Sequence, residues 1–153
     1  MSIRICLCSD NHGQIDCLQK IKQDNPSCDY YFHLGDSQLS EDYLRPFITV
    51  QGNNDWGMNF PRKRIIEISN HKILLIHGSG YTYSLSALSK KAIDEKCDVI
   101  MFGHTHEFLD DEYLGIRLIN PGSCWNNRDY SRPCYAIVNI DDFGKIDVER
   151  INL

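Results

Sequence analysis

Side chains of the kind that bind metal ions stand at five places in this chain, each time at the end of an apolar run. The five motifs are Asp10-Asn11-His12, Gly35-Asp36, Gly52-Asn53-Asn54-Asp55, His77-Gly78 and Gly103-His104-Thr105-His106. Their carboxylate, imidazole and amide donors suit two hard or borderline divalent cations that share a bridging ligand. Such a pair of cations can catalyse the hydrolysis of a phosphate ester.

The candidate ligands support one another, because each motif taken alone also fits a turn, a cap or a structural imidazole. The pair Asp10 and His12, like the pair His104 and His106, is spaced by two residues. In an extended turn, positions i and i+2 lie on the same side of the chain. The two oxygens of the Asp36 carboxylate suit it to bridge cations about 3.5–4 Å apart. The seven candidates are Asp10, His12, Asp36, Asn53, His77, His104 and His106.

Other polar residues near these motifs have plainer interpretations. Asp55 either orients a ligand histidine or is a simple turn residue. His33 lies inside a strand and is a core histidine or a support for a ligand, whereas His71 in a hairpin turn is expected to be solvated. Ser123 is interpreted as a turn residue lining the site, because no separate pair of histidine and acid is left to activate it.

The apolar runs predict the elements that must position these side chains. Strands are expected at 3–8, 30–34, 47–51, 64–68, 73–76, 99–102, 108–109, 115–119, 135–140 and 145–151, and helices at 15–23, 42–45 and 84–96. The first half alternates strand and helix, which favours parallel pairing, and the second half is rich in hairpins. We expect an α/β fold of two packed mixed β-sheets flanked by helices, with one domain over residues 1–153. Ligands of such sheets bind beyond the carboxyl ends of the strands.

The composition of the chain limits the classes of binding partner that we expect. The 153 residues are enough for one domain with a substantial core. The net charge of −5, without a basic stripe, argues against extended nucleic acid, although a small phosphate ester such as a nucleotide can bind at metals. No signal-peptide pattern and no apolar run of about 20 residues is present, so we expect a cytoplasmic protein with no membrane partner. The seven cysteines form no paired zinc-binding spacing, which favours reduced structural thiols.

The order of the motifs resembles the calcineurin-like metallophosphoesterase superfamily. The start Ser9-Asp10-Asn11-His12-Gly13, together with Asn120-Pro121-Gly122-Ser123 and Arg132-Pro133-Cys134-Tyr135-Ala136, is similar to the small bacterial and archaeal phosphodiesterase branch. The resemblance runs from about Ser9 to Ala136. It implies a four-layer αββα sandwich and two divalent metal ions. Manganese is the ion expected first, and nickel, iron, cobalt and zinc are the alternatives.

The resemblance also implies roles for single residues. One ion would be held by Asp10, His12, Asp36 and His106, and the other by Asp36, Asn53, His77 and His104. A hydroxide bridging both ions would attack the phosphorus in line with the leaving alcohol. The residues expected to be catalytic are Asp36, Asn54 and Asp55.

The chain departs from the family pattern at two positions. Asn54 replaces a histidine that protonates the leaving group in many superfamily members, although the phosphodiesterase branch lacks it too. Ser79 replaces a histidine that the branch often has after the His77-Gly78 pair. Asn54 is expected to contact the phosphoryl group, and Arg128 is either a second such contact or a solvated loop residue.

We therefore expect a binuclear metal-dependent phosphodiesterase. The alternatives are a phosphomonoesterase, a metal hydrolase acting on an amide or lactone, and a catalytically silent interaction scaffold of the same fold. The presence of all seven ligands disfavours the scaffold. The segment 56–61 is a contact surface, a substrate lid or a homo-oligomer interface. The pocket walls that would select the substrate are Trp56, Tyr81, Tyr83, Trp125 and Tyr130.

Overall fold

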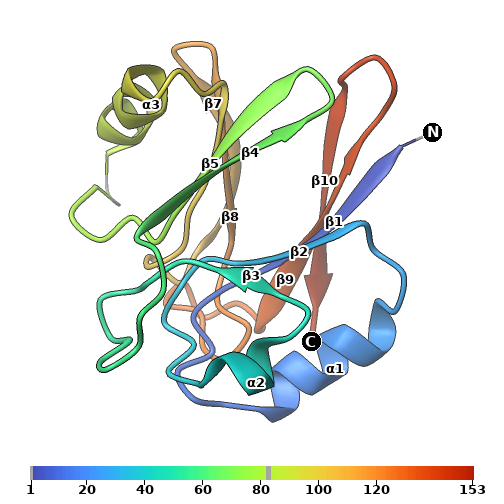
Figure 1. The fold of residues 1–153 in the computed structure, drawn as a ribbon, viewed down its shortest axis with the longest axis vertical. Helices are drawn as coiled ribbons and strands as arrows, with labels where there is room; N and C mark the ends of the chain where they lie inside the picture. Colours follow the sequence, from blue (N-terminus) through green and yellow to red (C-terminus); the bar gives the residue numbers. More distant parts are fainter. Residues whose placement is uncertain (1, 82–83) are drawn as a thin grey trace.

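The computed structural model describes residues 2–81 and 84–153. Its elements in chain order are β1 (Ile3–Cys8), α1 (Asp16–Asp24), β2 (Tyr30–His33), α2 (Glu41–Leu44), β3 (Ile48–Thr49), β4 (Lys63–Ile68), β5 (His71–Ile76), α3 (Leu85–Asp94), β6 (Val99–Met101), β7 (Phe108–Tyr113), β8 (Ile116–Pro121), β9 (Cys134–Ile140) and β10 (Ile146–Asn152). One sheet has the strand order β10-β9-β1-β2-β3 and the other β4-β5-β6-β8-β7. Figure 1 shows the two sheets facing each other, with α1 and α2 outside one sheet and α3 outside the other. The predicted pair of mixed sheets flanked by helices is confirmed.

Both sheets combine parallel and antiparallel pairs. In the first sheet β1, β2 and β3 are parallel, and β9 and β10 extend it with antiparallel pairs. In the second sheet β5, β6 and β8 are parallel, whereas β4 and β7 pair antiparallel at its edges. The second half of the chain therefore holds more parallel pairing than its hairpins predict. The crossover through α3 supplies the connection that a parallel pair requires.

The hydrophobic core fills the space between the sheets and continues on their outer faces. In β1, Ile5 and Leu7 point into the layer between the sheets, while Cys6 and Cys8 face the cluster that contains Leu18 of α1. This alternation follows from the two-residue period of a strand. A strand that is covered on both faces has a continuously apolar sequence, which explains why β1 could be located from the sequence.

Several element boundaries differ from the prediction. The strand β3 is limited to Ile48–Thr49, because the chain then leaves the sheet and the N–H of Gln51 donates to the carbonyl of Pro61. The hairpin of β7 and β8 is longer than expected. His71 was expected to be solvated in a turn, and this is wrong: it begins β5, is half-buried, and both ring nitrogens have hydrogen-bonding partners.

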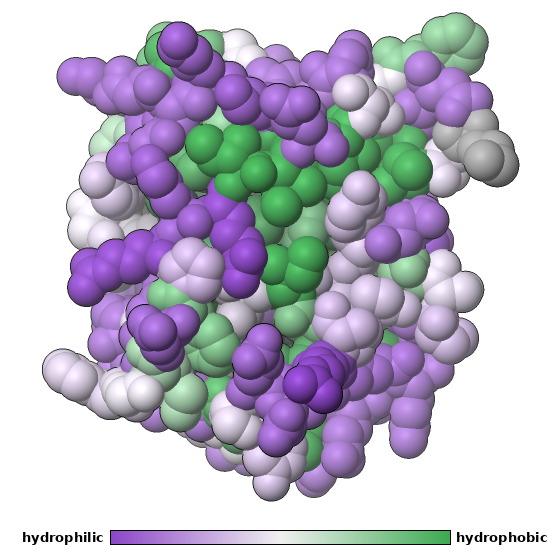
Figure 2. All heavy atoms as spheres, in the orientation of Figure 1, coloured by the Kyte–Doolittle hydropathy of each residue, from purple (hydrophilic) through white to green (hydrophobic). Residues whose placement is uncertain are grey.

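One edge of the sandwich is open to solvent. Figure 2 shows apolar side chains gathered on this face between β4 and the strands of the first sheet, with hydrophilic side chains around them. Ile3, Tyr30 and Ile66 are partly buried against the core between the sheets. Among the residues described, the structure contains no helix long and apolar enough to cross a membrane.

Candidate metal centre

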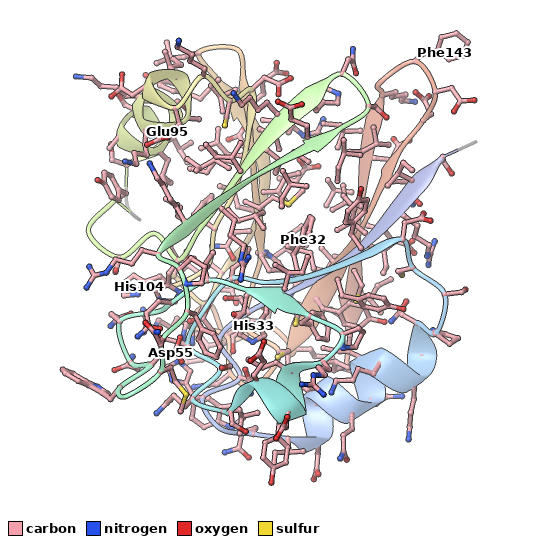
Figure 3. The ribbon with its side chains drawn as sticks, viewed as in Figure 1. Phe32, His33, Asp55, Glu95, His104 and Phe143 are labelled. Atoms are coloured by element: carbon pink, nitrogen blue, oxygen red, sulfur yellow. The ribbon has the colours of Figure 1, made fainter. Side chains whose placement is uncertain are left out.

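The five predicted motifs meet at one end of the sandwich. Figure 3 shows His33, Asp55 and His104 at this end, and Phe143 at the opposite end. The carboxyl ends of β1, β2, β5 and β6 lead into it, because the parallel strands of each sheet run in the same direction. Potential ligand atoms form two groups in which all atoms lie within 4.8 Å of one another: Asp10, His12 and His106, and Asp36, His77 and His104.

The first group surrounds a buried carboxylate oxygen. The Oδ1 atom of Asp10 is buried without a hydrogen-bond partner among the residues described. It lies 3.4 Å from Nε2 of His106 and 3.8 Å from Nε2 of His12, and these two ring nitrogens are 3.1 Å apart. A buried acceptor without a donor is costly. A cation at this point would satisfy the oxygen and both nitrogens, so the donor set fits a divalent metal.

The second group has a similar arrangement with an added amide. Nε2 of His77 lies 3.3 Å from Oδ2 of Asp36 and 3.2 Å from Nδ1 of His104. The Oδ1 atom of Asn53 lies 2.9 Å from the His77 nitrogen and 3.1 Å from the His104 nitrogen. Asn53 thus offers a neutral oxygen donor beside the three charged or imidazole donors.

The two groups are adjacent, and each carboxylate reaches toward the other group. Oδ2 of Asp36 is 3.8 Å from Nε2 of His12 in the first group. Oδ1 of Asp10 is 3.9 Å from Nε2 of His77 in the second group. Bridging by Asp36 stays a prediction, and the geometry gives Asp10 a comparable position.

Hydrogen bonds on the far side of the rings orient three of the histidines. Nδ1 of His77 lies 2.7 Å from the carbonyl of Leu34, and Nδ1 of His106 lies 2.8 Å from the carbonyl of Asn126. A carbonyl only accepts, so Nδ1 carries the proton and, in the neutral ring, leaves Nε2 free as a ligand. Nδ1 of His12 lies 2.7 Å from Oε1 of Gln38, a residue that sequence reasoning missed.

Both central carboxylates are stabilised in the charged form. Burial would raise the pKa of Asp36, but its contacts with His77 and with two N–H groups of Asn54 hold that pKa well below the usual range. The pKa of Asp10 is also lowered, because its interactions with His106, His77 and Ser9 outweigh its burial. The Ser9 hydroxyl donates to Oδ2 of Asp10 at 2.6 Å. The site is therefore anionic, as a cation-binding site requires.

Asp55 differs from one of its predicted roles. Its carboxylate accepts hydrogen bonds from the backbone N–H groups of Asp36 (2.9 Å), Gln38 (2.9 Å) and Gly52 (2.7 Å). The interpretation that it orients a ligand histidine is wrong, because its oxygens are used to hold two loops together. Asn54, in the same loop, holds Asp36, and its predicted contact with a phosphoryl group stays a prediction. Arg128 is exposed, and its Nη1 donates to the carbonyl of His104 at 3.3 Å.

The backbone at the ligands is left-handed instead of extended. Five of the seven candidates have positive φ: Asp10 (60°), His12 (45°), Asp36 (55°), His104 (71°) and His106 (57°). Such a conformation costs about 1–2 kcal/mol for a residue with a side chain. Asp10 and His12 fall into one group, as their spacing predicts, whereas His104 and His106 fall into different groups, so the prediction of a shared side is wrong for the second pair. Strain of this kind concentrates at functional sites.

Two glycines give the carboxylates their space. A Cβ atom on Gly103 would collide with the hydroxyl of Ser9 and lie 2.6 Å from Oδ2 of Asp10. A Cβ atom on Gly52 would lie 2.8 Å from Cγ of Asp36. These glycines precede His104 and Asn53 in the sequence, and close packing explains why no larger residue stands there.

Two buried polar residues support the loops that carry the ligands: His33, as one of its predicted roles has it, and Ser123, which was predicted to line the site. Burial lowers the pKa of His33 to about 4, so its ring is neutral. Its Nδ1 accepts from the N–H of Gly35, and its Nε2 therefore donates to Oδ1 of Asn11 at 2.8 Å. The hydroxyl of Ser123 is fully buried and donates to the carbonyl of Asp10 at 2.7 Å. Neither residue belongs to the two ligand groups.

The residues predicted to form the pocket walls lie in separate parts of the structure. Trp56 and Tyr81 line a cleft of about 720 Å³ that begins at Asn53 and His77. The ring of Trp125 lies 5.7 Å from that of His12, on the side of the first group. Tyr130 is fully exposed, and Tyr83 lies outside the described residues.

Comparisons with known proteins agree with this geometry. The sequence model of the calcineurin-like phosphoesterase superfamily domain matches residues 3–143. The chain is 32% identical over 145 residues to the probable metallophosphoesterase YsnB of Bacillus subtilis, covering 92% of this chain and 86% of the relative. A structure of an uncharacterised protein from Streptococcus pneumoniae, described as a predicted phosphoesterase, has a TM-score of 0.89 and 26% identity, covering 99% of this chain and 90% of the other.

Two more distant structures share the fold alone. One is Vacuolar Protein Sorting 29 from Cryptosporidium parvum, with a TM-score of 0.79 and 17% identity, covering 99% of this chain and 98% of the other. The other is described as a novel archaeal phosphodiesterase, with a TM-score of 0.72 and 23% identity, covering 99% of this chain and all of the other, 100%.

Proposed function

Because the chain belongs to the calcineurin-like phosphoesterase superfamily, we propose that it is a phosphodiesterase that uses two divalent metal ions to cleave a small phosphate ester. The observation that carries this proposal is the buried Oδ1 of Asp10, which has no donor among the described residues and faces ring nitrogens of two histidines. Without a cation there, this buried oxygen would lack a hydrogen-bond donor among the described residues, and such an unsatisfied acceptor is costly. A second complete donor group stands beside it.

The proposed ligands follow the two groups. One ion is assigned to Asp10, His12, Asp36 and His106, and the other to Asp36, Asn53, His77 and His104. Manganese is proposed first, and nickel, iron, cobalt and zinc are the alternatives. When bound, two such ions supply Lewis acidity toward the phosphate oxygens and an activated water as nucleophile.

The residues of the chain itself prepare this centre. Asn54 keeps the Asp36 carboxylate fixed and charged, and backbone carbonyls keep His77 and His106 in the tautomer that presents Nε2. Asp55 ties the Asp36 loop to the Gly52 loop, so hydrogen bonds join both sides of the second group. The geometry is thus set before substrate arrives, which is the main contribution a protein makes to such a centre.

The side chains at positions 54 and 79 favour a diester with a good leaving group. An asparagine amide and a serine hydroxyl have no pKa suited to protonating an alcohol at neutral pH. A substrate whose leaving alcohol is already acidic depends less on protonation of the leaving group by the protein. The solved archaeal structure of the same fold that is described as a phosphodiesterase adds support. The partners proposed are small phosphate esters, including nucleotides, without a membrane or extended nucleic acid, and a homo-oligomer through the exposed Trp56 segment is proposed as an alternative state.

A chromogenic assay tests this function. The protein is stripped of metal with a chelator and given bis(p-nitrophenyl) phosphate or p-nitrophenyl phosphate, with and without manganese. We expect diester cleavage that requires the added metal. Faster cleavage of the monoester would replace the proposal with a phosphomonoesterase. Absence of turnover with every divalent metal tried, despite bound ions, would favour a scaffold role, as the shared fold of Vacuolar Protein Sorting 29 allows.

A further inference from the structure

The cleft beside the second ligand group extends away from the metal centre toward α3. Its volume of about 720 Å³ is in the range of sites that hold a whole small-molecule ligand, and far exceeds the needs of one phosphoryl group. Its lining includes Asn53 and His77 of the centre together with the cationic side chains Arg62, Lys63 and Lys91. The cleft therefore joins the centre to a cluster of positive charge.

The fold brings these cations to the centre from two elements. In the antiparallel pair of β4 and β5, Lys63 is directly opposite Ile76, the residue before His77. Arg62 precedes Lys63 and lines the same cleft, while Lys91 reaches it from the last turn of α3. The strand register thus sets the start of β4 against the very end of β5 that delivers a candidate metal ligand.

The charge of this cluster is only partly compensated. Glu95 accepts from Nζ of Lys63 at 2.7 Å and lies 3.4 Å from Nζ of Lys91, so one carboxylate serves two lysines. Arg62 is exposed, and its guanidinium has no hydrogen bond or ion pair within residues 2–81 and 84–153. Figure 3 shows Glu95 on the α3 side of the molecule, above His104 and Asp55. The uncompensated cations make the cleft a candidate site for an anion.

Among the described residues that line the cleft, Asp55 is the one carboxylate, and it forms no ion pair with these cations. Asp55 lines the cleft, but its side chain is buried and accepts hydrogen bonds from three backbone N–H groups. The pairs of Lys63 and Lys91 with Glu95 are partly exposed, and such pairs contribute little to stability. The lysines can therefore turn to a second anion at small cost. This local excess of positive charge contrasts with the chain's net charge of −5.

Two aromatic side chains line the same cleft. Trp56 is 83% exposed and Tyr81 is 39% exposed, although large aromatic side chains are usually better buried. A planar base can stack on such a side chain, whichever base it is. An aromatic surface, a free guanidinium and a phosphate-processing centre in one cleft match the parts of a nucleotide.

We propose that this cleft binds a nucleotide portion of the substrate that carries a second phosphate group. Arg62, with Lys63 and Lys91, receives the second phosphate, and Trp56 and Tyr81 cover the base, while the phosphate to be cleaved occupies the metal centre. The inference rests on the proposed phosphodiesterase function and deepens it, because it names the substrate class as nucleotides with a phosphate beyond the one that reacts.

Calorimetric binding to the manganese-loaded protein tests the inference without turnover. The probes are adenosine 3′,5′-bisphosphate and adenosine 5′-monophosphate, which differ by one phosphate. We expect the bisphosphate to bind about tenfold more tightly, as one additional charge-assisted contact implies. Equal affinities for the two probes would overturn the inference.

Matched variants locate the effect. R62Q should remove most of the preference for the bisphosphate, whereas R45Q, at an exposed arginine directly after α2 and outside the cleft, should retain it. E95Q removes the carboxylate that competes for the two lysines and should strengthen bisphosphate binding. Trp56→Ala should weaken the binding of both adenosine probes but not that of ribose 5-phosphate. A preference that survives in R62Q and is unchanged in E95Q would contradict the assignment of these residues.

Parallel kinetics separate the two proposals. If the protein cleaves bis(p-nitrophenyl) phosphate with manganese but binds both adenosine probes equally, the phosphodiesterase function stands and the nucleotide inference fails. If it binds the bisphosphate in an Arg62-dependent manner but cleaves no ester, the cleft assignment stands and the phosphodiesterase function fails.

Discussion

Asn54 donates two hydrogen bonds to the Asp36 carboxylate, from its backbone N–H at 2.8 Å and from its side-chain Nδ2 at 3.0 Å. One residue thus binds both oxygens of the carboxylate that faces histidines of both ligand groups. The side-chain bond ends on Oδ2, the same oxygen that lies 3.3 Å from Nε2 of His77. Asn54 is therefore a positioning residue for the candidate metal ligand Asp36.

Asn54→Ala should weaken metal binding. The backbone bond remains, but Oδ2 of Asp36 loses the donor that fixes its direction, and loss of such a supporting bond typically costs 10–100-fold in metal affinity. Isothermal titration calorimetry of the chelator-stripped protein with manganese measures the metal affinity. Asn59→Ala, an exposed residue of the same loop region, is the control. Unchanged affinity in Asn54→Ala would show that the side-chain bond does not position the ligand.

Asp36→Asn should abolish hydrolysis while leaving the fold intact. The change removes the charge and directs an amide group toward donors from Asn54, so the second ligand group loses its anionic oxygen. We expect a fall in kcat of at least about 1,000-fold, comparable to the loss of a key electrostatic group. Kinetics with the chromogenic diester and a thermal melt measure both effects. Asp42→Asn, on an exposed carboxylate of α2, is the control, and near-normal turnover by Asp36→Asn would refute the role of Asp36.

Gly103→Ala should destabilise the protein and disturb the first ligand group. The added methyl group collides with the Ser9 hydroxyl and lies 2.6 Å from Oδ2 of Asp10. Overpacking of this kind costs about 1–3 kcal/mol. Denaturant unfolding measures the loss, and manganese affinity reports the displaced carboxylate. At Gly115, in the β7–β8 turn, a Cβ has open space but φ is +75°, so Gly115→Ala should cost stability without lowering metal affinity.

The stability contributed by His71 should depend on pH. Burial alone would lower the pKa of this histidine, but its hydrogen bonds to the Gly144 carbonyl and the Asp98 carboxylate outweigh burial and raise the pKa above 6.5. Both ring nitrogens face acceptors at 2.6 Å, so the protonated ring is the form that satisfies both bonds. The bond to Gly144 joins the β4–β5 hairpin to the β9–β10 turn, and the bond to Asp98 joins it to the residue before β6.

A raised pKa in the folded state means that the folded protein binds the proton more tightly than the unfolded chain does. The contribution is therefore complete below pH 6.5, the ordinary value, and is lost as the pH rises through the raised folded value. The difference in unfolding free energy between the wild type and His71→Gln should shrink across that window. Denaturant unfolding at a series of pH values measures it, and a difference that grows with pH would contradict the assignment.

The sequence carried most of the information about which atoms could do chemistry. The strand β1 begins and ends where its apolar run predicts, because a strand buried on both faces must be apolar throughout. The seven candidate ligands all lie at the predicted end of the sandwich, because the strands that precede them run toward one edge. These are local patterns, which can be recognised in the sequence without a structure.

The roles of the residues that support the candidate ligands could not be recognised from the sequence in the same way. Gln38, which orients His12, and Ser9, which donates to Asp10, belong to residue types that are common in ordinary turns. Asp55 has the same difficulty, because its carboxylate can orient a histidine or accept backbone N–H groups with equal chemical sense. Only the positions of the partner loops distinguish these uses.

The sequence by itself therefore determined the candidate donors and the edge of the sheets where they gather, because residue type and strand period are local properties. The family resemblance, but not the spacing of the motifs, implied that His106 joins Asp10 and His12 and that His104 joins Asp36 and His77, and the tertiary structure places the side chains in these two groups. The tertiary structure also placed the β4 cations beside the end of β5. The physical reason is that left-handed backbone at the ligands redirects neighbouring side chains, and that contacts such as the one between His12 and His106 join residues 94 positions apart.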